Sequence, residues 1–283
     1  KRYLLILIGT VLFSSGPVSA AQLIADKDNG SKLGINGGEY VNSGITLADA
    51  ALIASGSGYR IGANGLNIKV SDAMASSILA SVYLSQGAGI TLSNSVLTNG
   101  RVIATGADST LIFNTVSVMT PDAGNAIAVQ NGAEAELNSV TVGGGNYLAV
   151  FATNGSNVRI NNLNAASGVY FSASAGNIRN SRIETTSAVG VGVVNDQSDL
   201  FIEDSDIFGK AAGITVTNHG AVNFSRGTLA SDGNALVVNQ SGHFIGNNLN
   251  IQSGNRAIQA LAGGSVTLSG FSQIQGVSGI YAD

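Results

Sequence analysis

The residues best suited to chemistry in this chain are aspartates that lie close together in the sequence, with basic residues after them. They are Asp196, Asp199, Asp204, Asp206, Lys210, His219 and Arg226. Two or three aspartates on adjoining strands can serve as acid and base, or hold Ca²⁺ against a sugar acid. A structural role explains them as well, because Asp204 falls in a predicted corner and Asp206 precedes an inward-facing Ile207. Asp196 and Asp199 fall in a predicted loop. We therefore predict no catalytic residue.

Metal and cofactor chemistry has few residues to draw on. His219 and His243 are the only two histidines, and the chain contains no cysteine. The two histidines stand at different distances from the apolar residues that follow them, so we do not expect them to stack as a ligand pair. The lack of cysteine excludes disulfides, thiol catalysis and cysteine-bound zinc. We predict neither a metal nor a cofactor.

The composition argues against a nucleic-acid partner. Lys and Arg number 13 against 17 Asp and Glu, which gives a net charge of -4, and charged residues make up only 11% of the chain. A chain without a basic field does not attract a polyphosphate backbone. The 38 glycines, together with a mean hydropathy of +0.27, indicate a regular folded structure rather than disorder.

The N-terminal segment has the pattern of a secretory signal peptide. Lys1 and Arg2 precede an apolar run from Tyr3 to Phe13, and a stretch of small residues ends at Ala20. A membrane anchor is the alternative, but the apolar run is about half of the roughly 20 residues that span a bilayer. We predict cleavage after Ala20. The mature chain is then expected to be exported, to the cell surface or outer membrane or into the medium.

A unit of about 22 residues repeats through most of the chain. The segments at 125–145, 146–168 and 212–233 share one pattern. The sequence of the last segment is AGITVTNHGAVNFSRGTLASDG. Residues 31–80 carry looser versions of it. Sustained self-similarity at this period is typical of a solenoid. The first apolar residues of successive units are Val82, Val102, Ile127, Leu148, Val169, Val191, Ile214, Leu236, Ile258 and Ile280.

Apolar and polar residues alternate inside each unit, which predicts β-strands. The apolar positions of one unit are Ile214, Val216, Val222, Phe224 and Leu229. They mark three short strands in each unit. Because each strand recurs in the next unit, like strands can stack in parallel, and parallel crossovers are right-handed. The predicted fold class is all-β, a right-handed single-stranded parallel β-helix with rungs of about 22 residues.

A recurring motif, an apolar residue followed closely by Asn or Asp, predicts a sharp corner between the second and third strands. The corner residues are Asn94, Asn114, Asn138, Asn161, Asn180, Asp204 and Asn247. Asn tolerates the left-handed backbone conformation, and its amide can bond the same amide one rung away. We therefore expect a structural ladder. Asn138→Leu or Asn161→Leu is expected to lower the free energy of unfolding by roughly 1–3 kcal/mol, because a buried hydrogen bond is lost and the corner is strained.

Aromatic residues offer a second kind of surface, a stripe that binds sugar or protein. The side chains that suit it are Tyr83, Tyr147, Phe151, Tyr170 and Phe171. Strand alternation turns several of them toward the core, so packing is the default expectation for these residues.

The units from 81 to 283 resemble the passenger domain of pertactin-like autotransporters. The resemblance rests on the alternation in the unit at 212–233 and its sister units. In that family a signal peptide precedes a right-handed β-helix, cysteines are scarce, and a C-terminal outer-membrane β-barrel carries the passenger across the outer membrane. The resemblance implies an adhesin-like scaffold for an unknown host-cell protein or glycan. The alternative on this fold is a polysaccharide lyase or glycoside hydrolase similar to pectate lyases.

The expected organisation has three parts: a signal peptide at 1–20, irregular early rungs at 21–80 and a regular β-helix passenger at 81–283. The last unit opens at Ile280 and stops before its second strand. The final residues also lack the alternating strands with aromatic girdles that a barrel requires. We therefore expect the chain to be a piece of a longer protein whose barrel lies beyond residue 283.

Overall fold

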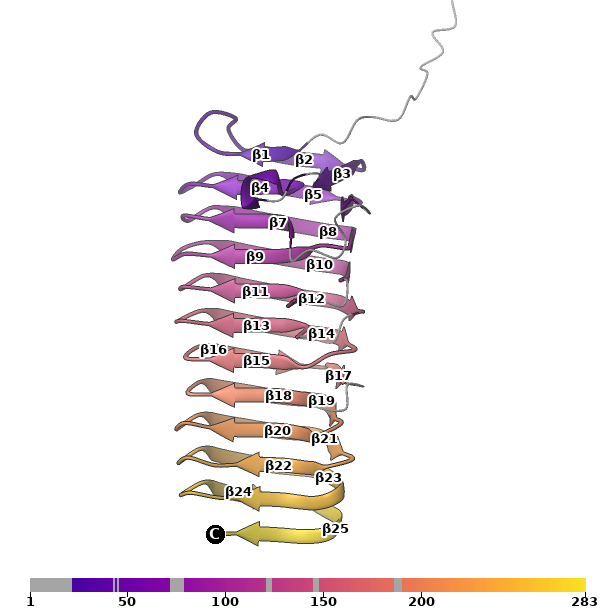
Figure 1. The fold of residues 1–283 in the computed structure, drawn as a ribbon, viewed down its shortest axis with the longest axis vertical. Coiled ribbons are helices and arrows are strands. Elements are labelled where there is room, and N and C mark those ends of the chain that lie inside the picture. The colour runs from indigo at the N-terminus through magenta and orange to yellow at the C-terminus, as the bar shows by residue number, and fades with distance from the viewer. Residues whose placement is uncertain are drawn as a thin grey trace, which may run out of the picture.

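The computed structural model describes residues 22–42, 44, 46–71, 79–120, 124–144, 148–185 and 190–283. Within them the chain winds into a right-handed parallel β-helix, a stack of rungs about 22 residues apart (Figure 1). Its 25 strands form one hydrogen-bonded set, and the pairings between them are parallel. The predicted fold class is confirmed. The predicted signal peptide and its cleavage after Ala20 lie outside the described residues.

Each rung has three faces, numbered in the order in which its strands form them. Face 1 carries the first strand of each rung: β1 (Leu23–Ala25), β4 (Leu52–Ser55), β7 (Ala80–Ser85), β9 (Arg101–Thr105), β11 (Ile127–Gln130), β13 (Val150–Thr153), β15 (Val169–Ser172), β18 (Val191–Asp196), β20 (Ala212–Thr217) and β22 (Asn234–Val238).

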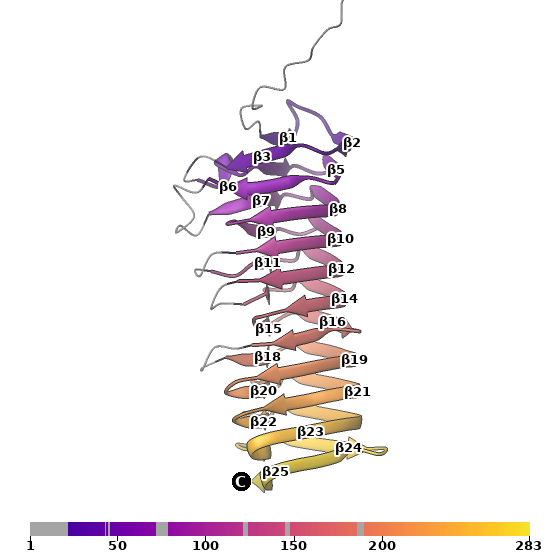
Figure 2. The ribbon, with the colours of Figure 1, turned by 90° about the vertical axis from the view of Figure 1, so that its right-hand side faces the viewer.

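Faces 2 and 3 carry the second and third strands. These are separate strands in some rungs: β2 (Lys32–Asn36), β3 (Glu39–Asn42), β5 (Arg60–Asn64), β6 (Asn67–Val70), β16 (Ala175–Arg179), β17 (Arg182–Glu184) and β24 (Ser265–Ser269). Elsewhere one long strand bends from face 2 to face 3 (Figure 2): β8 (Gly89–Thr98), β10 (Thr110–Met119), β12 (Glu134–Gly143), β14 (Asn157–Ala165), β19 (Asp199–Gly209) and β21 (Ala221–Ser231). Two strands near the C-terminal end continue onto face 1: β23 (His243–Ala260) and β25 (Gln273–Ala282).

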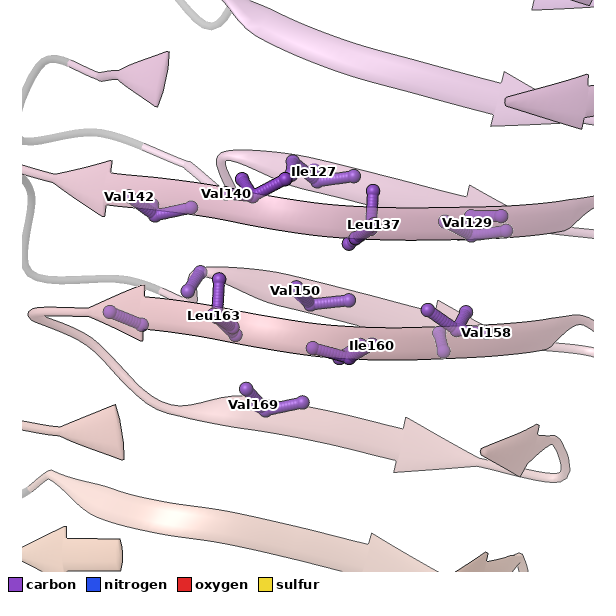
Figure 3. Packing of buried hydrophobic residues seen from close by; sticks show 14 of the residues in the cluster. Ile127, Val129, Leu137, Val140, Val142, Val150, Val158, Ile160, Leu163 and Val169 are labelled. Carbon is purple, nitrogen blue, oxygen red and sulfur yellow. The ribbon is translucent and has the colours of Figure 1, made fainter. Parts of the chain in front are cut away.

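Inward side chains from the three faces fill the centre with one continuous core. Figure 3 shows residues such as Val129, Leu137 and Ile160 packed between neighbouring rungs. Beside some of the large inward rings, a glycine leaves the space that the ring fills. A Cβ at Gly176 would lie 2.3 Å from the ring of Phe171, so no larger residue fits there without a shift in the packing.

The register corrects two of the predicted repeat positions. Leu148 and Val191 do not occupy the inward column of face 1. Val150 and Val193 occupy it instead, and both are fully buried, whereas Leu148 and Val191 are half-buried. The error is two residues in each case, which preserves the alternation and therefore leaves no trace in the sequence pattern.

The early rungs belong to the same stack but are longer. Leu23 lies beside Leu52, and Leu52 lies beside Val82, which are steps of 29 and 30 residues. A short 3-10 helix, η1 (Leu47–Asp49), takes up part of the extra length. No helix in the described ranges is long and apolar enough to cross a membrane.

Candidate functional site

The corner between faces 2 and 3 holds the residues of the predicted ladder in two adjacent columns. Asn94, Asn180 and Asp204 occupy the bend itself, with φ angles of 46°, 50° and 48°. In the other rungs the left-handed residue is the next one along, as at Thr115, whose φ is 58°. The four ladder residues that precede the bend are Asn114, Asn138, Asn161 and Asn247. The structure thus divides the expected single column into two.

Two pairs of ladder side chains bond each other across rungs. Asn138 Nδ2 donates to Asn114 Oδ1 at 3.1 Å, and Asn180 Nδ2 donates to Asn161 Oδ1 at 2.9 Å. Asn161 and Asn180 are exposed, and the other two are half-buried. The hydrogen bond expected to be buried at 138 and 161 is therefore only partly buried at Asn138 and is exposed at Asn161. Because water can replace it, its loss costs less than a buried bond would.

Buried serines close the same corner, and sequence reasoning missed them. Ser95, Ser181 and Ser205 directly follow the bend and are 4% exposed or less. Ser205 Oγ donates to the carbonyl of Glu203 at 2.8 Å and accepts the backbone N–H of Ser181 at 3.1 Å. Each hydroxyl thus bonds a backbone group that the bend leaves without a partner in the neighbouring strand. The signal was the recurrence of Asn-Ser or Asp-Ser at the corner.

The turn between faces 1 and 2 was also missed. It uses two successive left-handed residues, as in Asn131 and Gly132 with φ angles of 56° and 81°. His219 occupies the second of these positions with a φ of 64°, after Asn218 at 50°. The Asn-Gly pairs at these turns are the sequence signal for this geometry. His219 therefore has a backbone role at the turn.

The structure does not gather the four aspartates into one site. Asp196 ends β18 and accepts three hydrogen bonds there. Asp199 begins β19, and Asp206 faces solvent on face 3. Lys210 makes an ion pair with Asp232 on the next rung. In the part of the chain that the structure describes, no group of three His, Asp or Glu side chains could hold a metal ion.

Asp204 and Arg226 belong to a chain of four alternating charges beside the corner. Arg226 donates to both carboxylate oxygens of Asp204, at 2.7 and 2.9 Å, and also contacts Glu203. Arg179 Nε lies 3.2 Å from Glu203 Oε2. The hydrogen bond from Arg226 holds the pKa of Asp204 below its ordinary value. Two guanidinium and two carboxylate groups thus neutralise one another.

The candidate aromatic stripe is divided between the surface and the core. Tyr83, Phe151 and Tyr170 face outward in one column of face 1. Phe171 is fully buried, as alternation requires, and Tyr147 lies outside the described residues. Three of the five side chains therefore lie on the outer surface of face 1.

The outward column of face 1 is braced by its own members. The rings of Phe151 and Tyr170 stack with their centroids 5.5 Å apart, and the Tyr170 hydroxyl donates to Asp196 Oδ2 at 3.3 Å. Ala128, on the other side of Phe151, is only 7% exposed. Burial raises the pKa of Tyr170. These rings pack along the column and are half-buried.

Phe201 on face 2 stands in a different setting. It is 54% exposed and faces outward between the buried Leu200 and Ile202 of β19. Its neighbours in the outward column are two short amide side chains, Asn177 and Asn223. Sequence reasoning missed Phe201, although the strict alternation along β19 was enough to place it outside.

A hollow of about 310 Å³ opens beside Phe201. Phe201 and Ile245, which is 47% exposed, line its apolar side. In the adjacent column, Ser225 lies between the longer side chains of Glu203 and Asn247. Because the side chain of Ser225 is short, it leaves a gap there that forms part of the hollow. Polar side chains, among them Asn177, Asn223 and Asn247, make up most of the rest of its lining. The arrangement suits a ligand with both apolar and hydroxyl surface.

Comparison with known proteins adds no family to this description. No family model, curated protein or solved structure matches the chain. The functional inference therefore depends on the fold and on the surfaces of faces 1 and 2.

Proposed function

We propose that this chain is an exported autotransporter passenger that serves as an adhesin-like binding scaffold, at the cell surface or after release. One continuous parallel sheet system supports this, because stacked rungs hold one another and present extended faces to a partner. The observation that carries the proposal is the hollow beside Phe201, where an exposed ring and polar groups stand on a stacked sheet. The partner is a host-cell protein or glycan.

Polysaccharide cleavage on the same fold has less support. Asp204 is held by two hydrogen bonds from Arg226, and Asp206 lies on a different face. A carboxyl group whose pKa is lowered is a poor proton donor near neutral pH. The two carboxyl groups therefore do not form an acid and base pair, and Asp204 is poorly suited to donate a proton.

Two measurements on the protein as its own cells produce it test the proposal. External protease is expected to remove the chain from intact producing cells, and the purified chain is expected to bind cultured host cells saturably. Retention inside the producing cell contradicts export, and an absence of saturable binding contradicts the adhesin role. Cleavage of polyuronides that is lost in Asp204→Ala or Asp206→Ala favours the enzyme instead.

A further inference from the structure

We propose that the hollow beside Phe201 binds an uncharged glycan chain that lies along the axis of the β-helix. This rests on the proposed function and specifies the class of its ligand. Four features of face 2 carry the inference: an exposed ring, flanking amides, neutralised charges, and a second hollow that continues the first.

The apolar side of the hollow is exposed to water and would be covered by a bound ligand. Phe201 and Ile245 keep 54% and 47% of their surface in water. Removing apolar surface from water favours the bound state. The electron-rich face of a phenyl ring attracts C–H groups, and the apolar face of a pyranose presents a row of them. No second ring stacks on Phe201 in the described part of the chain.

The polar groups around the ring match hydroxyl groups. Asn223 lies between Phe201 and Ile245 in the same outward column, and Asn177 lies on the other side of Phe201. A carboxamide both donates and accepts hydrogen bonds, as a sugar hydroxyl does. A ring flanked by amides at the spacing of adjacent rungs can therefore hold a sugar by its apolar face and by its edge.

The charges at the rim select an uncharged ligand. Beside the first hollow, Arg179, Glu203, Arg226 and Asp204 are paired with one another, so neither of these two guanidinium groups is free to offset an acidic sugar or a phosphate. A charged ligand would have to break one of these pairs and leave its partner without compensation. An uncharged glycan leaves the pairs intact and can bond their outer lone pairs and N–H groups.

A second hollow extends the site along the same face. Asn177 and Arg179 line both hollows, and the second reaches Asn161 and Asn138. Its lining also includes the opposite charges of Arg159 and Glu136, which are neighbours in the outward column, so the second hollow adds no net charge. Rungs stack about 4.8 Å apart, so the two hollows together follow the axis over several rungs. The exposed ladder amides of the corner line this path. A chain of sugars fits such a path better than a single sugar does.

A glycan array probed with the full chain tests the proposal directly. The array carries uncharged glucans, galactans, mannans and N-acetylhexosamine chains, with hexagalacturonate as the acidic probe. We expect binding to an uncharged chain, and calorimetry on that ligand should show Phe201→Ala weakening it at least tenfold. Phe201→Trp should restore it. The matched control is Phe151→Ala, which removes a ring from face 1 and should leave the affinity unchanged.

The outcomes separate this proposal from the broader one. Binding to hexagalacturonate alone, equal affinity in a folded Phe201→Ala variant, or no binding on the array overturns the glycan hollow. Host-cell adhesion by the wild type together with no binding on the array keeps the scaffold function and overturns the hollow. Glycan binding without host-cell adhesion supports the hollow and overturns the adhesin role.

Discussion

Face 1 and face 2 both turn aromatic rings outward, but the two faces use them differently. On face 1, Phe151 stacks on Tyr170, and the hydroxyl of Tyr170 is tied to Asp196. On face 2, Phe201 stands between short amide side chains and keeps more than half of its surface in water. The identity of the residue one rung away therefore decides whether an outward ring braces the sheet or remains available to a ligand.

The largest expected difference is between a ring inside the stack and the exposed ring of face 2. Phe171 is fully buried and fills the space left by Gly176, so Phe171→Ala should lower the free energy of unfolding by about 3–5 kcal/mol. Phe201→Ala should change it by less than about 0.5 kcal/mol. Urea unfolding of both variants measures the difference. A large loss in Phe201→Ala would mean that face 2 uses its ring for stability, as face 1 does.

The corner offers a second contrast, between a buried hydroxyl and a half-buried amide. Ser205→Ala removes the acceptor of the buried N–H of Ser181, and we expect it to cost about 1–3 kcal/mol. Asn138→Ala removes a partly exposed bond to Asn114, which water can replace, and should cost less than about 0.5 kcal/mol. Thermal melts compare the two. Equal losses of stability in the two variants would mean that the ladder amides support the corner as much as the buried serines do.

The fold was predictable because the pattern that specifies it is repeated. Alternation and a steady period identify stacked parallel strands even when single units are irregular. The register of individual rungs was not predictable to the residue, because loops of unequal length enter them. Leu148 and Val191 stand two residues from Val150 and Val193, and both choices satisfy the alternation.

The surfaces were less predictable than the fold. A column of side chains is defined by residues about 22 apart, so its composition depends on a register that must be known to the residue. Correct pairing shows that Phe201 lies between Asn177 and Asn223 and that Phe151 lies beside Tyr170. The corner illustrates the same limit, since a shift of one residue separates a left-handed bend from the surface position before it.

The bracing of face 1 can be measured as a coupling energy. In a double-mutant cycle of Phe151→Ala and Tyr170→Ala, the stacked pair should contribute about 0.5–1.5 kcal/mol beyond the sum of the single changes. The control cycle on face 2 pairs Phe201→Ala with Ile245→Ala, whose side chains are separated by Asn223. That cycle should be additive within about 0.3–0.5 kcal/mol. Coupling of similar size on both faces would remove the distinction between them.

The smallest expected effect is a pH dependence confined to face 1. Burial raises the pKa of Tyr170, with the charge of Asp196 adding to the shift. The ordinary pKa of tyrosine is about 10, so the unfolded chain loses this proton first as the pH rises. The free energy of unfolding should therefore carry this contribution in full below pH ~10 and lose it as the pH rises through the pKa of the folded state. Urea unfolding at a series of alkaline pH values should show a steeper decline for the wild type than for Tyr170→Phe, whereas Phe201→Ala should follow the wild type. Identical slopes for the wild type and Tyr170→Phe would mean that the hydroxyl is as well solvated in the folded chain as in the unfolded one, and that stacking alone braces face 1.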